Sequence, residues 1–323
     1  MKYFIDGWDP SYGSSVEDLG EPEGFVSTAR VTVDVERSAE DWAPVCVPEG
    51  PEPGRVLFVD GVRRIEARVW AGSADGTNAD LGVAASWGAG VVCCCDLGAH
   101  VLLAEQRRGL FTTAPDAAPL PTRAGEFTRH AVAAADDQAP AQLLNAALQG
   151  QLADLELLTT LTARSTDHLH GVEDDLVVVD GPLRGRQHLP RTIGFIKSHR
   201  ATYLPEELNL QVALLAPGER TPVFLMGTTW ERYAWYLRLP GRPGAPWAGV
   251  VRIECSAELE LPEVTALAGL TQRLLPRFAS VEYKDSRAPQ NLVPIAGLER
   301  DLRHRLGEPT FVLRALQQAA ART

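Results

Sequence analysis

Two short apolar runs, each ending in Asp-Gly, most strongly constrain what this chain can fold into. They are residues 55–61 (RVLFVDG) and residues 175–181 (DLVVVDG). Uninterrupted runs of Val, Leu and Phe are typical of strands buried on both faces, and the Gly lets the backbone turn directly after the carboxylate. Asp60 and Asp180 are therefore predicted to lie where buried strands reach the rim of a sheet. Two carboxylates on rigid strand ends suit a divalent cation, although Asp-Gly is also an ordinary turn signal.

Composition and charge limit the class of protein. The chain has 323 residues, 45% hydrophobic and 23% charged, as in ordinary globular proteins. A net charge of −11 argues against a broadly basic nucleic-acid-coating protein but leaves room for a local basic groove. No apolar run is long enough to span a membrane, and the start turns acidic too early for a secretory segment, so we expect a cytoplasmic protein.

Residues 1–54 are expected to form an N-terminal extension that ends in a linker rich in Pro, Glu and Gly, and residues 55–323 one domain. Period-2 alternation over residues 62–70 predicts a second strand, antiparallel to the first and joined to it by a tight turn at Asp60-Gly61. The other predicted strands cover residues 81–95, 100–107, 175–180, 191–203, 221–227, 233–239 and 249–255. Helices are predicted over residues 141–163, 205–215, 261–278, 294–306 and 309–320.

This order of elements resembles the ribonuclease-H-like fold, an α/β fold with a mixed sheet flanked by helices. In that fold, acids at strand ends and one helix acid hold one or two divalent metals. Two residues of the helix over 141–163 compete for the helix position, Glu156 and Asp154. Glu156 is preferred because it lies four residues after Leu152, on the flank of the apolar face, whereas Asp154 lies on roughly the opposite side. No Gly-rich phosphate-binding run supports a doubly wound nucleotide fold.

Three segments in this order make the resemblance more specific. They are Asp60-Gly61, residues 180–183 (DGPL) followed by 193–199 (IGFIKSH) and 203–205 (YLP), and residues 285–295 (DSRAPQNLVPI). Together with residues 8–12 (WDPSY), they make the chain similar to the NurA nuclease family over about residues 8 to 315. Members of this family are manganese-dependent DNA nucleases that work with a HerA-type hexameric translocase in DNA-end processing.

The resemblance implies that Asp60, Glu156 and Asp180 hold Mn2+, with Mg2+ as the alternative ion. It also implies DNA as the substrate, a HerA-type hexameric ATPase as the partner, and a homodimer. The chain departs from the family pattern at Val293, where the family carries a Tyr. This departure puts the fourth ligand in doubt; Glu299 is our choice for it, and Asp285 is the second choice.

The basic segment that contains Lys197, His199 and Arg200 is predicted to hold the DNA backbone. The residues predicted to contact nucleic acid are Lys197, His199, Arg200, Arg63, Gln290 and Asn291. A solvated loop is the alternative for the basic segment, and the aromatic run over residues 233–237 fits a dimer face, a DNA-stacking surface or the core. The altered late segment also leaves a second function open, a catalytically degenerate family member that binds DNA or the ATPase as a structural partner.

Overall fold

The computed structural model describes residues 25–26, 29–72, 79–135, 138–165, 174–199, 201–242 and 244–322. The chain divides into two compact units. The first contains Met1–Phe58, Cys93–His100 and Gly171–Ala296, and the second contains Val59–Val92, Val101–His170 and Gly297–Thr323. The boundaries fall within β3 (Arg55–Gly72), β5 (Gly98–Thr112) and α4 (Val293–Arg305) and near the end of β4 (Ala79–Cys95), so these elements contribute residues to both units.

The first unit is a mixed sheet in the order β2-β11-β12-β13-β9-β8, followed by the ends of β3, β4 and β5 that belong to this unit. Its strands are β2 (Arg30–Thr32), β8 (Asp175–Asp180), β9 (Thr192–Ile196), β11 (Phe224–Gly227), β12 (Glu231–Arg238) and β13 (Val250–Ser256). β8 and β9 are parallel, whereas β9 pairs antiparallel with β13 and β13 with β12. A separate parallel pair joins β1 (Phe25–Val26) to β10 (Ala201–Thr202).

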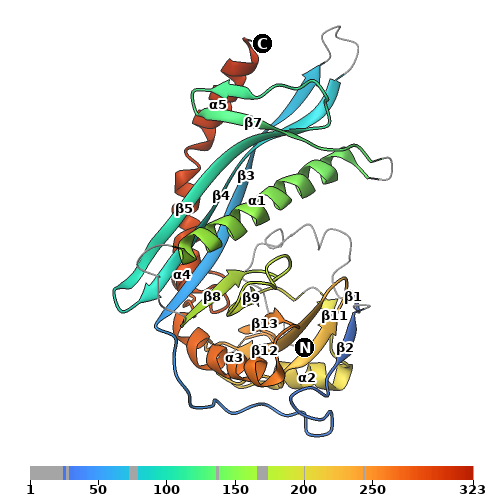
Figure 1. The fold of residues 1–323 in the computed structure, drawn as a ribbon, viewed down its shortest axis with the longest axis vertical. Helices are drawn as coiled ribbons and strands as arrows, with labels where there is room; N and C mark the ends of the chain where they lie inside the picture. Colours follow the sequence, from blue (N-terminus) through green and yellow to red (C-terminus); the bar gives the residue numbers. More distant parts are fainter. Residues whose placement is uncertain are drawn as a thin grey trace. The chain divides into compact units, whose positions relative to one another are not determined.

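Helices cover both faces of this sheet (Figure 1). Leu208 and Val212 of α2 (Glu206–Leu214) pack with Tyr236 of β12 in one apolar cluster. Trp235, which directly precedes Tyr236 in β12, points to the other face of the sheet. Its indole N–H donates to Thr271 of α3 (Leu261–Leu274), with 3.2 Å between the heavy atoms. Because successive side chains of a strand point to opposite faces, the aromatic run of β12 is core on both sides.

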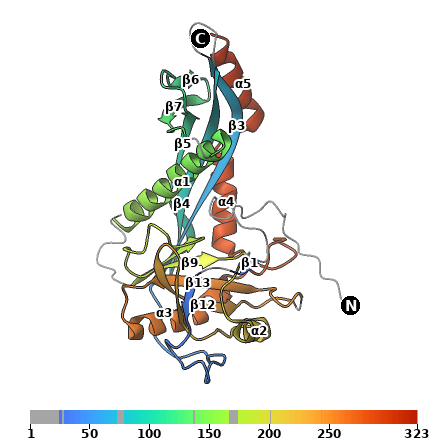
Figure 2. The ribbon, with the colours of Figure 1, turned by 90° about the vertical axis from the view of Figure 1, so that its right-hand side faces the viewer.

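The second unit has the strand order β3-β4-β5-β7-β6, in which β6 is Leu120–Thr122 and β7 is Gly125–Ala131. Ala85 of β4 packs with α1 (Pro140–Arg164), whereas its neighbour Ala84 packs with α5 (Pro309–Ala320). The two helices therefore lie on opposite faces of the sheet, as Figure 2 shows.

The predicted α/β class is confirmed, with a large mixed sheet flanked by helices. β8, the strand that follows α1 in the chain, lies beside β3, and β9 lies parallel to β8 on its other side. The predicted domain boundary after residue 54 remains a prediction. Residues before it nevertheless pack into the first unit, because Glu36 pairs with buried Arg220 and Trp42 joins the α2 cluster.

Three predictions about elements were wrong. The chain makes no turn at Asp60-Gly61, because β3 runs on without interruption from Arg55 to Gly72. The strand predicted over residues 191–203 is two strands, β9 and β10, and the strands β6 and β7 were not predicted. The helical spacing Leu152, Leu155, Leu158 predicts that Leu158 lies on the apolar face of α1, but Leu158 is 42% exposed.

Candidate functional site

Asp180 is the last residue of β8, and its carboxylate meets the ammonium group of Lys197 in the first unit. The distance from Lys197 Nζ to Asp180 Oδ2 is 2.5 Å. Gly181 follows with φ at +105°, a conformation that favours glycine, so the predicted turn after Asp180 is confirmed. The side chains of Lys197 and Asp180 are 9% and 15% exposed, which makes this a partly buried ion pair at a strand end.

The Lys197 ammonium is held from its other side by the late segment. Asn291, fully buried, accepts a hydrogen bond from Lys197 Nζ at 3.1 Å and donates one from its amide to Asp285 Oδ2 at 2.6 Å. Burial alone would raise the pKa of Asp285, but the hydrogen bonds from Asn291 and from the Arg287 backbone lower it below its usual value. A line of alternating donors and acceptors therefore runs from Asp285 through Asn291 and Lys197 to Asp180.

Gln290 holds the backbone of the same lysine. Its amide donates to the carbonyl oxygens of Lys197 and Val250, each at 2.9 Å. His199 Nε2 donates to the same Val250 oxygen at 2.9 Å. The two segments quoted in the sequence analysis, residues 193–199 (IGFIKSH) and 285–295 (DSRAPQNLVPI), are thus hydrogen-bonded to one another in the structure.

His199 packs against aromatic rings, with centroid distances of 5.0 Å to Trp247 and 5.7 Å to Tyr236. Burial lowers the pKa of His199 to about 4, so the ring is neutral at pH 7. His199 therefore adds no positive charge at this pH, and its predicted contact with nucleic acid stays a prediction. Asn291 is fully buried and makes its contacts inside the protein, and Arg200 lies outside the described residues, so the predicted contacts of both with nucleic acid stay predictions.

A buried glutamate supports the turn that follows Asp180. Glu254 of β13, with no exposed surface, accepts the backbone N–H of Leu183 at 2.6 Å and the side-chain N–H of Arg232 at 2.9 Å. A Cβ added at Gly194 of β9 would lie 2.8 Å from the Leu183 nitrogen and 2.9 Å from Gly181 O. The position of this turn therefore depends on a charged group and on a glycine that the sequence analysis did not single out.

In the second unit, Gly61 follows Asp60 in β3 and faces Glu156 of α1. Its backbone N–H donates to Asp60 Oδ1 at 2.7 Å, and a Cβ at this position would overlap Glu156 Oε1. Asp60 and Glu156 are both 9% exposed, whereas Asp154 is exposed, so the preferred acid of α1 is the one that turns inward. Gly61 thus serves close approach of α1 to β3 rather than the expected turn.

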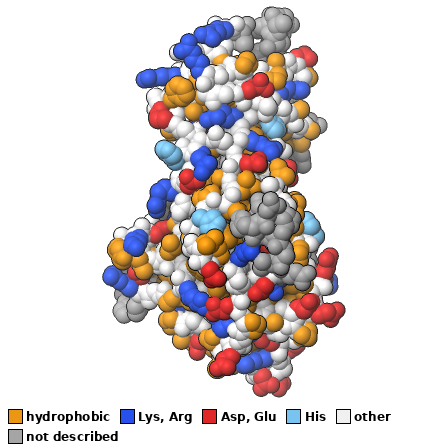
Figure 3. Space-filling view, turned by 60° about the vertical axis from the view of Figure 1, so that its left-hand side comes forward, with side chains coloured by type: hydrophobic (Ala, Val, Ile, Leu, Met, Phe, Trp, Pro, Cys, Tyr) orange, Lys and Arg blue, Asp and Glu red, His pale blue; other side chains and the backbone are white. Residues whose placement is uncertain are grey.

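The remaining predicted residues are engaged in other contacts. Glu299 is 7% exposed and accepts a hydrogen bond from Arg303, one helical turn later, at 2.6 Å. Arg63 donates to the side chain of Asn145, and burial lowers its pKa. On the face seen in Figure 3, Lys and Arg side chains of the described residues are interspersed with Asp and Glu side chains.

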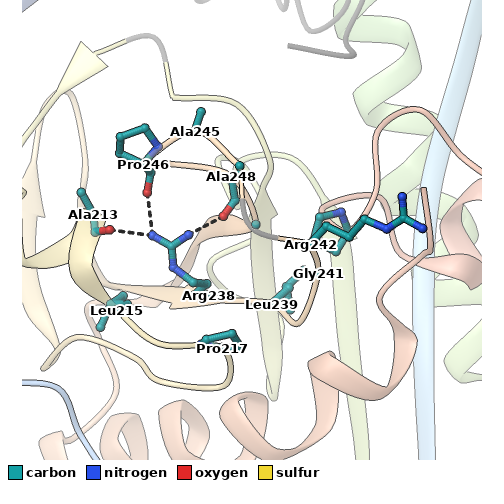
Figure 4. Close-up of a pocket in the computed structure, with 13 residues that line it drawn as sticks. Ala213, Leu215, Pro217, Arg238, Leu239, Gly241, Arg242, Ala245, Pro246 and Ala248 are labelled. Atoms are coloured by element: carbon teal, nitrogen blue, oxygen red, sulfur yellow. Dashed lines mark hydrogen bonds between the residues drawn. The ribbon is translucent and has the colours of Figure 1, made fainter. Parts of the chain in front are cut away.

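A cavity of about 290 Å3 lies among the loops of the first unit. Arg238 lines it and donates to the carbonyl oxygens of Pro246 and Ala248 at 2.6 Å and of Ala213 at 2.9 Å (Figure 4). These bonds tie β12 to α2 and to the loop over residues 244–249, so Arg238 has a structural role. None of the residues predicted to bind metal or nucleic acid lines this cavity.

No family model and no curated protein matches this chain by sequence. Among solved structures, it is similar to the NurA nuclease from Sulfolobus solfataricus, with 11% identity, a TM-score of 0.42, and 83% of this chain and 85% of that chain covered. It is also similar to human endonuclease V, with 17% identity, a TM-score of 0.35, and 79% and 84% covered. For endonuclease V from Bacillus subtilis, the identity is 14%, the TM-score 0.33, and the coverage 82% of both chains.

The carboxylates present fit a divalent metal by their chemistry. Hard cations prefer carboxylate oxygens, and Mg2+ is often bound by only one or two of them, with water and substrate in the other positions. Asp60 and Glu156 are carboxylates of this kind, although Asp60 and the side of Gly61 that meets Glu156 lie on opposite faces of β3. Within the described part of the chain, however, no three His, Cys, Asp or Glu residues are grouped closely enough to hold one ion.

Proposed function

We propose that this chain is a divalent-metal-dependent DNA nuclease of NurA type. The observation that carries the proposal is the burial of Asp60 on β3 and of Glu156 on α1, each 9% exposed, since buried acids on rigid elements suit a divalent cation. Asp180, at the end of β8, is the third ligand that we propose from the sequence. Mn2+ or Mg2+ would supply the positive charge that phosphodiester hydrolysis requires.

The chain's own groups would position the DNA. Lys197 provides an ammonium at the end of β9, and its backbone and side chain are both held by the Gln290-Asn291 segment. A cation fixed in this way suits a phosphate oxygen, because it is oriented before the substrate arrives. We propose Glu299 as a further acid of the site, with its carboxylate oriented by Arg303.

The proposal is tested by cleavage of end-labelled single- and double-stranded DNA with Mn2+, with and without a HerA-type ATPase. The rate of cleavage should fall at least about 100-fold in each of three variants, Asp60→Asn, Glu156→Gln and Asp180→Asn. Losing a residue that only supports a metal ligand costs up to about 100-fold, and losing a ligand itself should cost no less. Asp154→Asn is the matched control, because Asp154 is an exposed acid on the same helix and its loss should leave the rate unchanged. EDTA should abolish cleavage by the unmodified protein.

A non-catalytic function is the second candidate, and one observation favours it. No three possible metal ligands are grouped in the described residues, and Asp180 is already neutralised by Lys197. DNA or ATPase binding without any cleavage would support this structural role. Full activity of Asp60→Asn would show instead that the ligand assignment is wrong.

The proposed homodimer and the proposed HerA-type partner are tested by the mass of the protein in solution and by co-elution with the ATPase. Among the described residues, no helix is both long and apolar enough to cross a membrane. The cytoplasmic location stays a prediction.

A further inference from the structure

The ion pair at the end of β8 has an unusual choice of cation. The chain contains 28 arginines but only three lysines, Lys2, Lys197 and Lys284. Other buried acids of the first unit pair with arginine, as Glu36 does with Arg220 through two hydrogen bonds. Arginine forms such two-point contacts with a carboxylate, whereas lysine offers a compact point charge.

Because the contact between Lys197 and Asp180 has only one point, another cation can replace the Lys197 ammonium at this carboxylate. The contact uses one carboxylate oxygen, Oδ2, and one ammonium group. A divalent ion has the same need as the ammonium, which is anionic oxygen, and two cations at one carboxylate repel each other. Asp180 is therefore a position where an internal cation and a bound ion compete.

Asn291 keeps the lysine in place if Asp180 is taken by another cation. Its amide orientation is unambiguous, because Asp285 only accepts and the Lys197 ammonium only donates, so the nitrogen faces Asp285 and the oxygen faces Lys197. Gln290 fixes the Lys197 carbonyl independently of the side chain. The ammonium therefore has a second partner that does not depend on Asp180.

We propose that Lys197 is an internal counter-ion that occupies Asp180 in the metal-free protein and competes with the divalent metal for this carboxylate. When a metal ion takes Asp180, Lys197 stays on Asn291 and offers its ammonium to a phosphate oxygen of the nucleic acid. Asn291 is then a positioning residue. This inference rests on the proposed function, because it assumes that Asp180 is a metal ligand.

The test measures Mn2+ binding to the full chain by the electron paramagnetic resonance signal of free Mn2+, which does not depend on activity. Lys197→Met should bind Mn2+ about tenfold more tightly than the unmodified protein, and the gain should disappear when Asp180→Asn is also present. Arg305→Met is the matched control, because it removes an exposed pair with Asp301 at 2.6 Å and should not change the affinity. Unchanged or weaker binding by Lys197→Met overturns the proposal.

Amine footprinting with mass spectrometry gives a second measurement, which avoids altering Lys197. Lys197 should react faster with an acylating reagent in Mn2+, and faster without metal in Asp180→Asn and in Asn291→Leu, while Lys284 reacts at a constant rate. Equal labelling of Lys197 with and without Mn2+ would overturn the competition. A protein that shows both effects but cleaves no DNA would refute the proposed nuclease and leave the competition standing, whereas one that binds no Mn2+ would overturn both.

Discussion

Replacing Glu254 by Gln should destabilise the first unit far more than an exposed substitution of the same kind. Glu254 is fully buried, and its two oxygens accept from Leu183 and Arg232, while Arg252 lies 3.9 Å from Oε2. The Gln oxygen can still accept from Leu183. The Gln nitrogen, however, would face the Arg232 N–H, so a donor would oppose a donor and two buried guanidinium groups would lose their counter-charge.

The expected loss follows from the burial of both partners. The side chains of Arg232 and Arg252 are each 7% exposed and that of Glu254 0%, so solvent screens the charges little. Removing one partner of a buried pair costs about 3–5 kcal/mol, because the other charge stays buried without compensation. Against a total stability of about 5–15 kcal/mol, this is a large fraction of the free energy of unfolding.

The measurement is urea unfolding of the full chain, followed by the fluorescence of the buried tryptophans. Glu40→Gln is the control, because Glu40 is an exposed glutamate of the same unit, and its midpoint should not move. Equal midpoints for Glu254→Gln and the unmodified protein would refute the reasoning, since they would show that Glu254 does not compensate the buried arginines.

Two further predictions use other features of the first unit. Since burial lowers the pKa of His199 from 6.5 to about 4, the unfolded chain takes up a proton between these values and the folded chain does not. Stability should therefore be complete above pH 6.5 and fall by at most about 3 kcal/mol as the pH drops to 4, and His199→Phe should remove this part of the pH dependence while exposed His304→Gln keeps it. Gly194→Ala should cost about 1–3 kcal/mol in thermal or urea unfolding because its Cβ meets backbone atoms, whereas Gly150→Ala, with open space inside α1, should gain about 0.5–1 kcal/mol. A loss of similar size in both glycine variants would contradict the packing argument.

Several features of the fold were readable from local pattern. The apolar spacing that predicted a helix over residues 141–163 matches α1 at Pro140–Arg164, and the Val-rich run ending at Asp180 is β8. The choice of Glu156 over Asp154 as the inward acid also followed from helical spacing. These predictions succeeded because periodicity reports which face of an element is buried.

Gly61 shows where local pattern failed. Asp-Gly after an apolar run is a good turn signal, yet β3 continues through it, because the missing Cβ makes room for Glu156 on a helix almost a hundred residues later in the chain. No local signal separates a glycine that turns the chain from one that admits a neighbour. The same applies to Gly194, whose role depends on Leu183 and Glu254.

The sequence by itself determined the α/β class, most of the elements, and the two strands whose carboxylates define the candidate ligands. Only the tertiary structure decided what the polar residues of the late segment do. It joins Asn291 to Lys197 and Asp285, and it places His199 among aromatic rings instead of on a basic surface. The physical reason is that periodicity depends on neighbours in the chain, whereas the partner of a polar side chain depends on which distant segment lies within hydrogen-bond distance.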